Sequence, residues 1–323
     1  MRGQALPLLD PGSLDAAASA VQELFSEVAR QPEELRRYLD ERVPKAPRGS
    51  VFVGAGDSYA AALAGFYASG GRCMAVDPYT LASEPEVARG VEVFFISISG
   101  RTSSNLLALS KAKRVARKTT ALTAVVGSEL ARDADEVVAL PLKYAPRTPG
   151  LLTFSVSALA VLKMAGAAGP CDFEGVFESA KSDSRRMSLA RGTTYFLGNS
   201  LGHAAAVYAS AKVYELLGSR AHAEALEEFS HMELFSLRRS DSVNIFSAFD
   251  PSGMARKLEN ALSKERYHST RVPGRGRSPM ESFFHCVFAS QSWCLAEASK
   301  AGLRSPRFLA EESRLRVSDA MIY

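Results

Sequence analysis

One strand–turn–helix unit occurs twice in this sequence, and it restricts the possible folds more than any other feature. In residues 51–62, Val-Phe-Val-Gly-Ala-Gly-Asp-Ser-Tyr-Ala-Ala-Ala, an apolar run meets two glycines, a serine and an alanine-rich segment. Such a run predicts a strand that ends in a turn, and the alanines predict a buried helix. Residues 194–206, Thr-Tyr-Phe-Leu-Gly-Asn-Ser-Leu-Gly-His-Ala-Ala-Ala, follow the same order. The repeat predicts two copies of one αβα domain.

Predicted strands and helices alternate along both copies. In the first copy, strands are expected at Ser50–Val53, Arg72–Val76, Val91–Ser97, Thr119–Val126 and Glu136–Leu140, and helices at Ser58–Ser69, Ser103–Val115, Glu129–Asp133 and Leu151–Ala165. In the second copy, further strands are expected at Ser242–Ala248 and His268–Val272, and helices at Glu174–Ala190, Met254–Ser263 and Met280–Lys300. The alternation predicts an α/β fold of two αβα sandwiches, each with a doubly wound, mainly parallel, flavodoxin-like sheet of five strands.

The N-terminal residues read as helix rather than strand. Apolar positions recur at helical spacing between Ser13 and Arg42, and Pro32 is expected to end one helix and start a second. We therefore expect an N-terminal helical arm outside the sheets. The expected boundaries are residues 1–43 for the arm, 44–170 for the first domain and 171–323 for the second domain.

Composition excludes several classes of protein. Hydrophobic residues make up 46% and charged residues 23% of the chain, as in a globular protein, and a net charge of +4 does not call for nucleic acid. The apolar segment 151–169 contains Lys163 and reads as a buried helix rather than a membrane span. Without a signal peptide or paired cysteine spacing, a cytoplasmic protein with reduced thiols and no membrane partner is expected. The cysteines are Cys73, Cys171, Cys286 and Cys294.

Two hydroxyl-rich turns are expected at the same edge of the first sheet. One follows the strand at 50–53, and the other, Ser-Ile-Ser-Gly-Arg-Thr at 97–102, follows the strand at 91–97. Helix N-termini and free backbone N–H groups at the carboxyl ends of parallel strands favour phosphate. In the alternative interpretation these hydroxyls only cap helices. The candidate phosphate-binding residues are Gly56, Asp57, Ser58, Ser97, Ser99 and Thr102.

These motifs resemble the sugar isomerase (SIS) family of phosphosugar-binding domains. Residues 97–102 match the family's S-x-S-G-x-T turn, with Arg101 where glutamate is usual, and the likeness extends over roughly residues 45–310. The chain resembles the isomerase half of glucosamine-6-phosphate synthase and its stand-alone relatives, including archaeal phosphoglucose/phosphomannose isomerases. The resemblance implies a small phosphosugar ligand and requires neither a cofactor nor a metal.

The same resemblance implies catalytic residues in the second copy. Lys212 and Glu215 lie three residues apart, share a helix face and match the family's K-x-x-E, whose glutamate is the general base. Without the family they would read as an ordinary surface pair. His222 lies in an H-A-E-A match, and His231 corresponds to the ring-opening histidine, with His222 in reserve. In the family this histidine reaches the neighbouring subunit, which implies a homodimer; Lys212 is expected to stabilise enediolate charge.

The implied activity is aldose–ketose isomerisation of a hexose 6-phosphate through an enediol, with a glutamate base and no metal. Two alternatives stay open: an amino-sugar-phosphate deaminase or deglycase, and a non-catalytic regulator that binds a sugar phosphate. The chain departs from the synthase in lacking its C-terminal lysine, since it ends Ala-Met-Ile-Tyr at 320–323. It also lacks a lysine in the loop 147–150.

Overall fold

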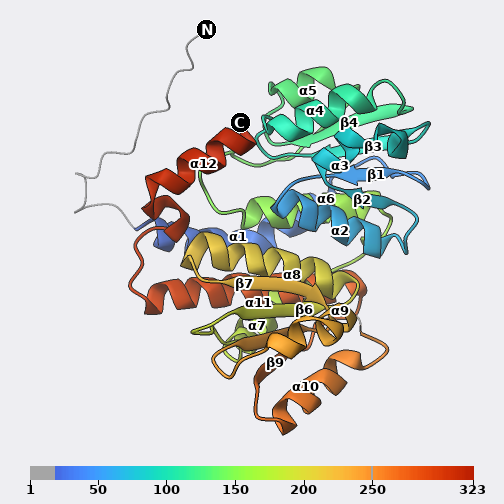
Figure 1. Cartoon of the computed structure of the whole chain (residues 1–323). Coiled ribbons are helices and arrows are strands. Elements are labelled where there is room, and N and C mark those ends of the chain that lie inside the picture. Colours follow the sequence, from blue (N-terminus) through green and yellow to red (C-terminus); the bar gives the residue numbers. More distant parts are fainter. Residues whose placement is uncertain (1–18, 249) are drawn as a thin grey trace.

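A computed structural model describes residues 19–248 and 250–323, in which two parallel sheets are separated by a layer of helices (Figure 1). The first sheet has five strands in the order β2-β1-β3-β4-β5, and the second has four in the order β7-β6-β8-β9. The strands are β1 Val51–Val53, β2 Met74–Val76, β3 Glu92–Ile96, β4 Lys118–Thr123, β5 Glu136–Ala139, β6 Thr194–Gly198, β7 Ala221–Ala225, β8 Ser242–Phe246 and β9 His268–Val272.

Helices cover both faces of each sheet. The α-helices are α1 Ala20–Asp40, α2 Asp57–Ala68, α3 Pro78–Ser83, α4 Ser103–Ala112, α5 Glu129–Asp133, α6 Leu152–Met164, α7 Phe173–Ser184, α8 Leu201–Lys212, α9 Leu226–His231, α10 Met254–Lys264, α11 Pro279–Lys300 and α12 Glu312–Ile322. Short helical turns are η1 Pro85–Ala88, η2 Val213–Leu217, η3 Glu233–Ser236 and η4 Arg307–Ala310. Among them, η2 is a π-helix that continues α8.

One hydrophobic core joins the two sheets through the middle layer. It combines Phe52 and Phe94 from the first sheet, Phe196 and Phe246 from the second, and the buried faces of α1, α2, α6, α7, α8 and α11. Separate clusters lie on the outer faces, one under α3 and α4 and the other under α9 and α10. Helices α2 and α6 are apolar on nearly all sides because they are buried between layers.

The strand and helix positions predicted from sequence are largely confirmed, including the parallel order of the first sheet. The prediction of five strands in the second sheet is wrong for the described residues, where this sheet has four. After β9, residues 273–278 lead directly into α11, so no helix–strand pair corresponding to α5 and β5 is inserted. Strand β7 was not predicted as a strand, because its residues were recognised only as the H-A-E-A motif.

Helix α1 also differs from its prediction. It is one continuous helix with Pro32 inside it, whereas a break at Pro32 was expected. Proline removes one intrahelical hydrogen bond, but Val28 and Leu35 on either side are buried and hold the two segments in line. The helix contacts α6, α7 and α11 in the middle layer, so it is part of the core rather than a peripheral arm. The part of the predicted helix at residues 13–18 lies outside the described part of the chain.

The internal repeat is visible in backbone conformation. Gly56 before α2 has φ 57° and ψ −126°, and Ser200 before α8 has φ 53° and ψ −129°. A Cβ on Gly54 or on Gly198 would overlap the backbone of the residue four positions later. Both units therefore make the same sharp turn, in which strand and helix approach closely. A serine with positive φ costs roughly 1–3 kcal/mol, so the second turn is held in a strained conformation by its surroundings.

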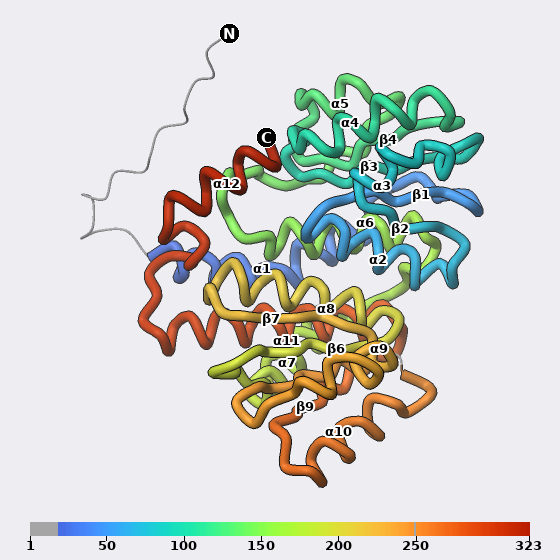
Figure 2. The backbone as a smooth tube through the Cα atoms, viewed as in Figure 1, coloured from blue at the N-terminus to red at the C-terminus, as the bar shows by residue number. Residues whose placement is uncertain are grey.

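The C-terminal helix crosses back to the first half of the chain. Figure 2 shows α12, in red, beside the green segment that precedes α6. Arg147 in this segment donates a hydrogen bond to Asp319 of α12 at 3.0 Å. Within the described residues, no helix is both long and apolar enough to span a membrane, and the segment 151–169 forms the buried 13-residue helix α6 instead.

Candidate active site

The two predicted turns lie side by side at the carboxyl edge of the first sheet. Strands β1 and β3 are parallel neighbours with Val53 opposite Phe95, so their carboxyl ends coincide. Helix α2 begins after Gly56, and α4 begins after Thr102. The first N–H groups of each helix lack partners within that helix and carry partial positive charge. The arrangement is therefore suited to an anion.

Serine and threonine hydroxyls shape the second turn. Ser97 Oγ accepts a hydrogen bond from Gly100 N at 3.2 Å and lies 3.4 Å from Thr102 Oγ1, and Ser99 Oγ accepts one from Arg101 N at 3.3 Å. Thr102 occupies the N-cap position of α4, but its side chain makes no capping hydrogen bond. Simple helix capping does not account for Thr102. The buried carboxamide oxygen of Asn105, in the first turn of α4, also has no hydrogen-bond partner in the described chain.

We expect Gly100→Ala to weaken binding of a sugar phosphate by about tenfold. Gly100 has φ 60°, and a Cβ there would overlap Ser128 Oγ, so the turn must move. If the displaced turn must be brought back to its binding geometry against a strain of roughly 1–2 kcal/mol, the affinity falls about tenfold. Calorimetric titration with fructose 6-phosphate measures the effect.

Gly70→Ala is the matched control for this substitution. Gly70 has φ 64°, but a Cβ there would meet nothing within 4 Å. This variant therefore carries similar backbone strain away from the turn and should bind as the unmodified protein does. Equal affinities of the Gly100 and Gly70 variants would contradict a role of the turn in binding.

A buried ammonium group lies beside the first turn. Lys212, at the end of α8, is fully buried, and its Nζ donates hydrogen bonds to Asp57 Oδ2 at 2.6 Å and to Glu215 Oε2 at 2.5 Å. The ammonium group of Lys212 also lies over the ring of Tyr208, with Nζ 5.2 Å from the ring centroid. Asp57 belongs to α2 and Glu215 to η2, so this cluster joins the two halves of the chain.

Burial and neighbouring charges shift the pKa values of Asp57 and Lys212. Burial raises the pKa of Asp57 to about 7; Lys212 opposes this rise and Glu215 adds to it. Burial alone would lower the pKa of Lys212, but attraction by Asp57 and Glu215 outweighs burial and raises this pKa. Lys212 is therefore a stable ammonium ion, and Asp57 exchanges its proton near neutral pH. A carboxyl group that exchanges its proton near neutral pH is suited to acid–base chemistry.

Glu215 reaches this position through the π-helix. The turn from Val213 to Leu217 follows α8 directly and ends at Gly218, which has φ 61°. The i,i+3 spacing noted in the sequence brings Lys212 and Glu215 together, but the wider turn sets their direction. π-Helical turns recur at functional sites, where they reorient a side chain. Lys212 is fully buried, which rules out the interpretation of this pair as an ordinary surface ion pair.

Polar residues that sequence reasoning missed support this cluster. Tyr208 Oη donates to Gly150 O at 2.8 Å and accepts from Gln291 Nε2 at 2.9 Å. Gln31 Nε2 donates to Gln291 Oε1 at 2.8 Å, and both glutamines are fully buried. Gly150 in turn packs so closely on Asp57 that a Cβ would overlap Oδ2. The only sequence signal for these residues is a polar side chain, such as Gln31, on the apolar face of a helix.

Helix α1 contributes a further carboxylate. Glu27 Oε1 accepts a hydrogen bond from Leu152 N at 2.8 Å and so caps α6, whose own N-cap side chain makes no such bond. Burial raises the pKa of Glu27, while the Leu152 amide and the positive charges of Arg30 and Lys212 oppose the rise. The N-terminal helix is therefore electrostatically linked to the Lys212 cluster.

The other candidate residues occupy different places. The side chain of Asp57 pairs with Lys212, so only the backbone of Asp57, in the first turn of α2, remains suited to an anion. Ser58 is half-buried in the same turn. His222 Nε2 lies 3.0 Å from Glu233 Oε1, and His231 is paired with the exposed Glu227 at 3.1 Å. Neither histidine contacts the Lys212 cluster within the described chain, because β7 and α9 place them elsewhere.

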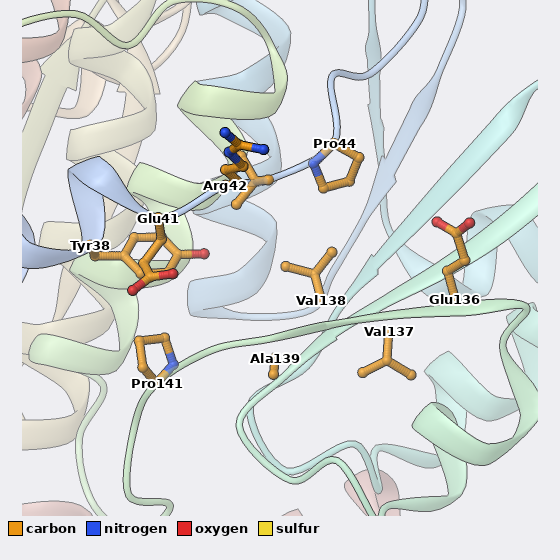
Figure 3. A pocket seen from close by; sticks show the side chains of 10 residues that line it. Tyr38, Glu41, Arg42, Pro44, Glu136, Val137, Val138, Ala139 and Pro141 are labelled. Atoms are coloured by element: carbon orange, nitrogen blue, oxygen red, sulfur yellow. The ribbon is translucent and has the colours of Figure 1, made fainter.

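A surface cleft of about 400 Å³ lies away from both turns (Figure 3). It separates the end of α1 from β5, which forms an edge of the first sheet. It contains none of the hydroxyl, ammonium or carboxylate groups described above, so its size does not identify it as the active site. Its lining residues are Tyr38, Glu41, Arg42, Val43, Pro44, Glu136, Val137, Val138, Ala139 and Pro141.

Residues 48–166 match the SIS domain family. A search among curated proteins finds no match to the sequence.

Solved structures share the fold over most of the chain. Glucosamine-6-phosphate deaminase from Thermotoga maritima has 19% identity and a TM-score of 0.72, over 87% of this chain and 95% of that one. Tagatose-6-phosphate ketose/aldose isomerase from Escherichia coli has 17% identity and a TM-score of 0.68, over 90% and 97%. The C-terminal domain of glucosamine-fructose-6-phosphate aminotransferase from Francisella tularensis has 15% identity and a TM-score of 0.62, over 89% of this chain and 98% of that one. Residues 48–166 therefore match a SIS domain, and the likeness to these solved structures shows a shared fold over most of the chain.

Proposed function

We propose that this protein is a phosphosugar isomerase that interconverts an aldose and a ketose hexose 6-phosphate. The observation that carries the proposal is the position of the Lys212–Glu215–Asp57 cluster beside the hydroxyl-rich turns. If the turns hold the phosphate and the cluster supplies the carboxylate base, a short sugar chain would be fixed between them. Remote phosphate binding then serves to orient the reacting carbons.

In this proposal Glu215 moves the proton between C1 and C2 of the open-chain sugar. Lys212 supplies positive charge for the enediolate oxygen, and Asp57, which exchanges its proton near neutral pH, is placed to protonate it. The phosphate is assigned to Ser58, Ser97, Ser99, Thr102 and the backbone of the two turns.

We further propose a homodimer in which His231 serves the pocket of the neighbouring subunit. His231 is 71% exposed, and Met232 and Phe235 nearby are 52% and 83% exposed, which is unusual for large apolar side chains on an unpartnered surface. Sedimentation should therefore give twice the chain mass of 34.7 kDa. A fully active monomer would contradict this assembly and the role of His231.

The test of the reaction is incubation with fructose 6-phosphate in deuterated water, followed by proton NMR. Deuterium at C1 or C2, together with glucose or mannose 6-phosphate, is the expected result. Saturable binding without exchange would instead support a regulator that binds a sugar phosphate. A second activity deserves a parallel assay, because one structure that shares the fold is that of a glucosamine-6-phosphate deaminase. Release of ammonia from glucosamine 6-phosphate would favour that reaction.

A further inference from the structure

Three potential metal ligands meet at the edge of the second sheet, apart from the Lys212 cluster. His222 and Glu224 are two residues apart on β7, an edge strand, so their side chains lie on the same face. Glu233, in η3, approaches them from the segment that follows α9. One ligand atom from each residue lies within 4.8 Å of the other two.

The two distances from His222 are compatible with a metal site. His222 Nε2 lies 3.0 Å from Glu233 Oε1 and 3.9 Å from Glu224 Oε2. Ligand atoms bound to zinc at 2.0–2.1 Å in tetrahedral geometry are roughly 3.3 Å apart, and the two observed distances lie on either side of this value. Small side-chain rotations would therefore suffice to bind an ion.

Glu233 carries an unexplained oxygen in this group. Its Oε1 faces His222, but its Oε2 is buried and has no hydrogen-bond partner in the described chain. A buried carboxylate oxygen without a partner is costly. Two carboxylates facing one imidazole also bring together more negative charge than one histidine can balance. A cation bound by both oxygens of Glu233 would satisfy both requirements.

The surroundings hold two of the ligands in place. Ala225 N donates a hydrogen bond to Glu224 Oε1 at 2.8 Å, which leaves Oε2 directed towards His222. The ring of Tyr195 packs edge-on against His222, with centroids 6.0 Å apart. Such supporting contacts orient ligands and are typical of metal sites.

We propose that His222, Glu224 and Glu233 form a binding site for a divalent transition-metal ion of the zinc type. One imidazole and two carboxylates form a donor set that zinc accepts, with a fourth position open to water. The ion would fasten η3 to the edge strand β7.

This site is distinct from the proposed chemistry. In the described chain, none of the hydrogen bonds and ion pairs of His222, Glu224 and Glu233 involves Lys212, Asp57 or Glu215. The metal site and the isomerase proposal can therefore succeed or fail independently.

The test uses the protein freed of metal and titrated with zinc against a chromophoric chelator. One equivalent per chain is expected, and His222→Ala and Glu233→Gln should each weaken binding at least tenfold. Zinc should also raise the melting temperature of the unmodified protein but not of these variants. Glu227→Gln is the control, since Glu227 forms a similar exposed pair with His231 but has no third ligand.

Cobalt supplies an independent measurement that does not depend on the folding of any variant. Intense visible absorption bands of four- or five-coordinate cobalt in the unmodified protein would support the site. A spectrum of the hydrated ion would overturn the proposal. It would also fail if all variants bound zinc as tightly as the unmodified protein, because the ion would then be bound elsewhere.

Discussion

Replacement of Glu215 by glutamine is expected to lower the rate of deuterium exchange into fructose 6-phosphate by about 10³-fold. Glutamine has the same shape, and its carbonyl oxygen can still accept the hydrogen bond that Lys212 donates at 2.5 Å. It cannot, however, take up the proton from carbon. Because the phosphate is assigned to other residues, the affinity for the sugar should change little. Proton NMR gives the rate, and calorimetry gives the affinity.

Glu178→Gln is the control for this result. Glu178 lies on α7, is 58% exposed and pairs loosely with Lys181 at 3.8 Å, so its loss should leave exchange unchanged. If Glu215→Gln exchanged deuterium within tenfold of the unmodified rate, another group would have to be the base. Exchange that is absent from both variants and from the unmodified protein would point to a binding protein without turnover.

Lys212→Met is expected to lower the free energy of unfolding by about 3 kcal/mol. Methionine fills a similar volume, so packing changes little. The substitution leaves the carboxyl groups of Asp57 and Glu215 side by side, with no cation between them, at a site where Asp57 Oδ1 already lacks a hydrogen bond. Denaturant unfolding measures the loss. Lys181→Met should change stability by less than about 0.5 kcal/mol, because its i,i+3 pair is exposed.

The destabilisation should depend on pH in a defined direction. Lys212 opposes the rise in the pKa of Asp57, so removing Lys212 raises this folded-state pKa further above about 7. A carboxyl group whose folded pKa exceeds its unfolded value stabilises the fold at low pH and loses this effect as pH rises. The Lys212→Met variant should therefore be most destabilised near pH 8 and least near pH 5. An equal loss of stability at pH 5 and pH 8 would show that the unpaired carboxyl groups of Asp57 and Glu215 are not its cause. In that case, adding Asp57→Asn should fail to restore stability.

Local sequence patterns predicted most helices and strands of this fold, because these patterns depend only on residues that are close together in the chain. Strand β9 and helix α5 have the bounds read from the sequence, because local signals mark their ends: Ser128 caps the start of α5, and Pro273-Gly274 ends β9. A helix break was predicted at Pro32 because proline removes a hydrogen bond within the helix. Burial in the middle layer nevertheless keeps α1 continuous. The fifth strand expected in the second sheet is missing from the described residues because repeats need not keep every element.

The sequence alone determined the α/β class, the internal repeat and the pairing of Lys212 with Glu215, since all three depend on spacings along the chain. Only the tertiary structure decided the partner of Lys212, because Asp57 lies 155 positions away and meets it only when α2 and α8 pack together. The same packing brings Glu27 and Gln31 of α1 towards the site. Charges at such distances along the chain interact only after both sheets have buried their faces against one helical layer. The electrostatics of the site are therefore a property of the folded molecule.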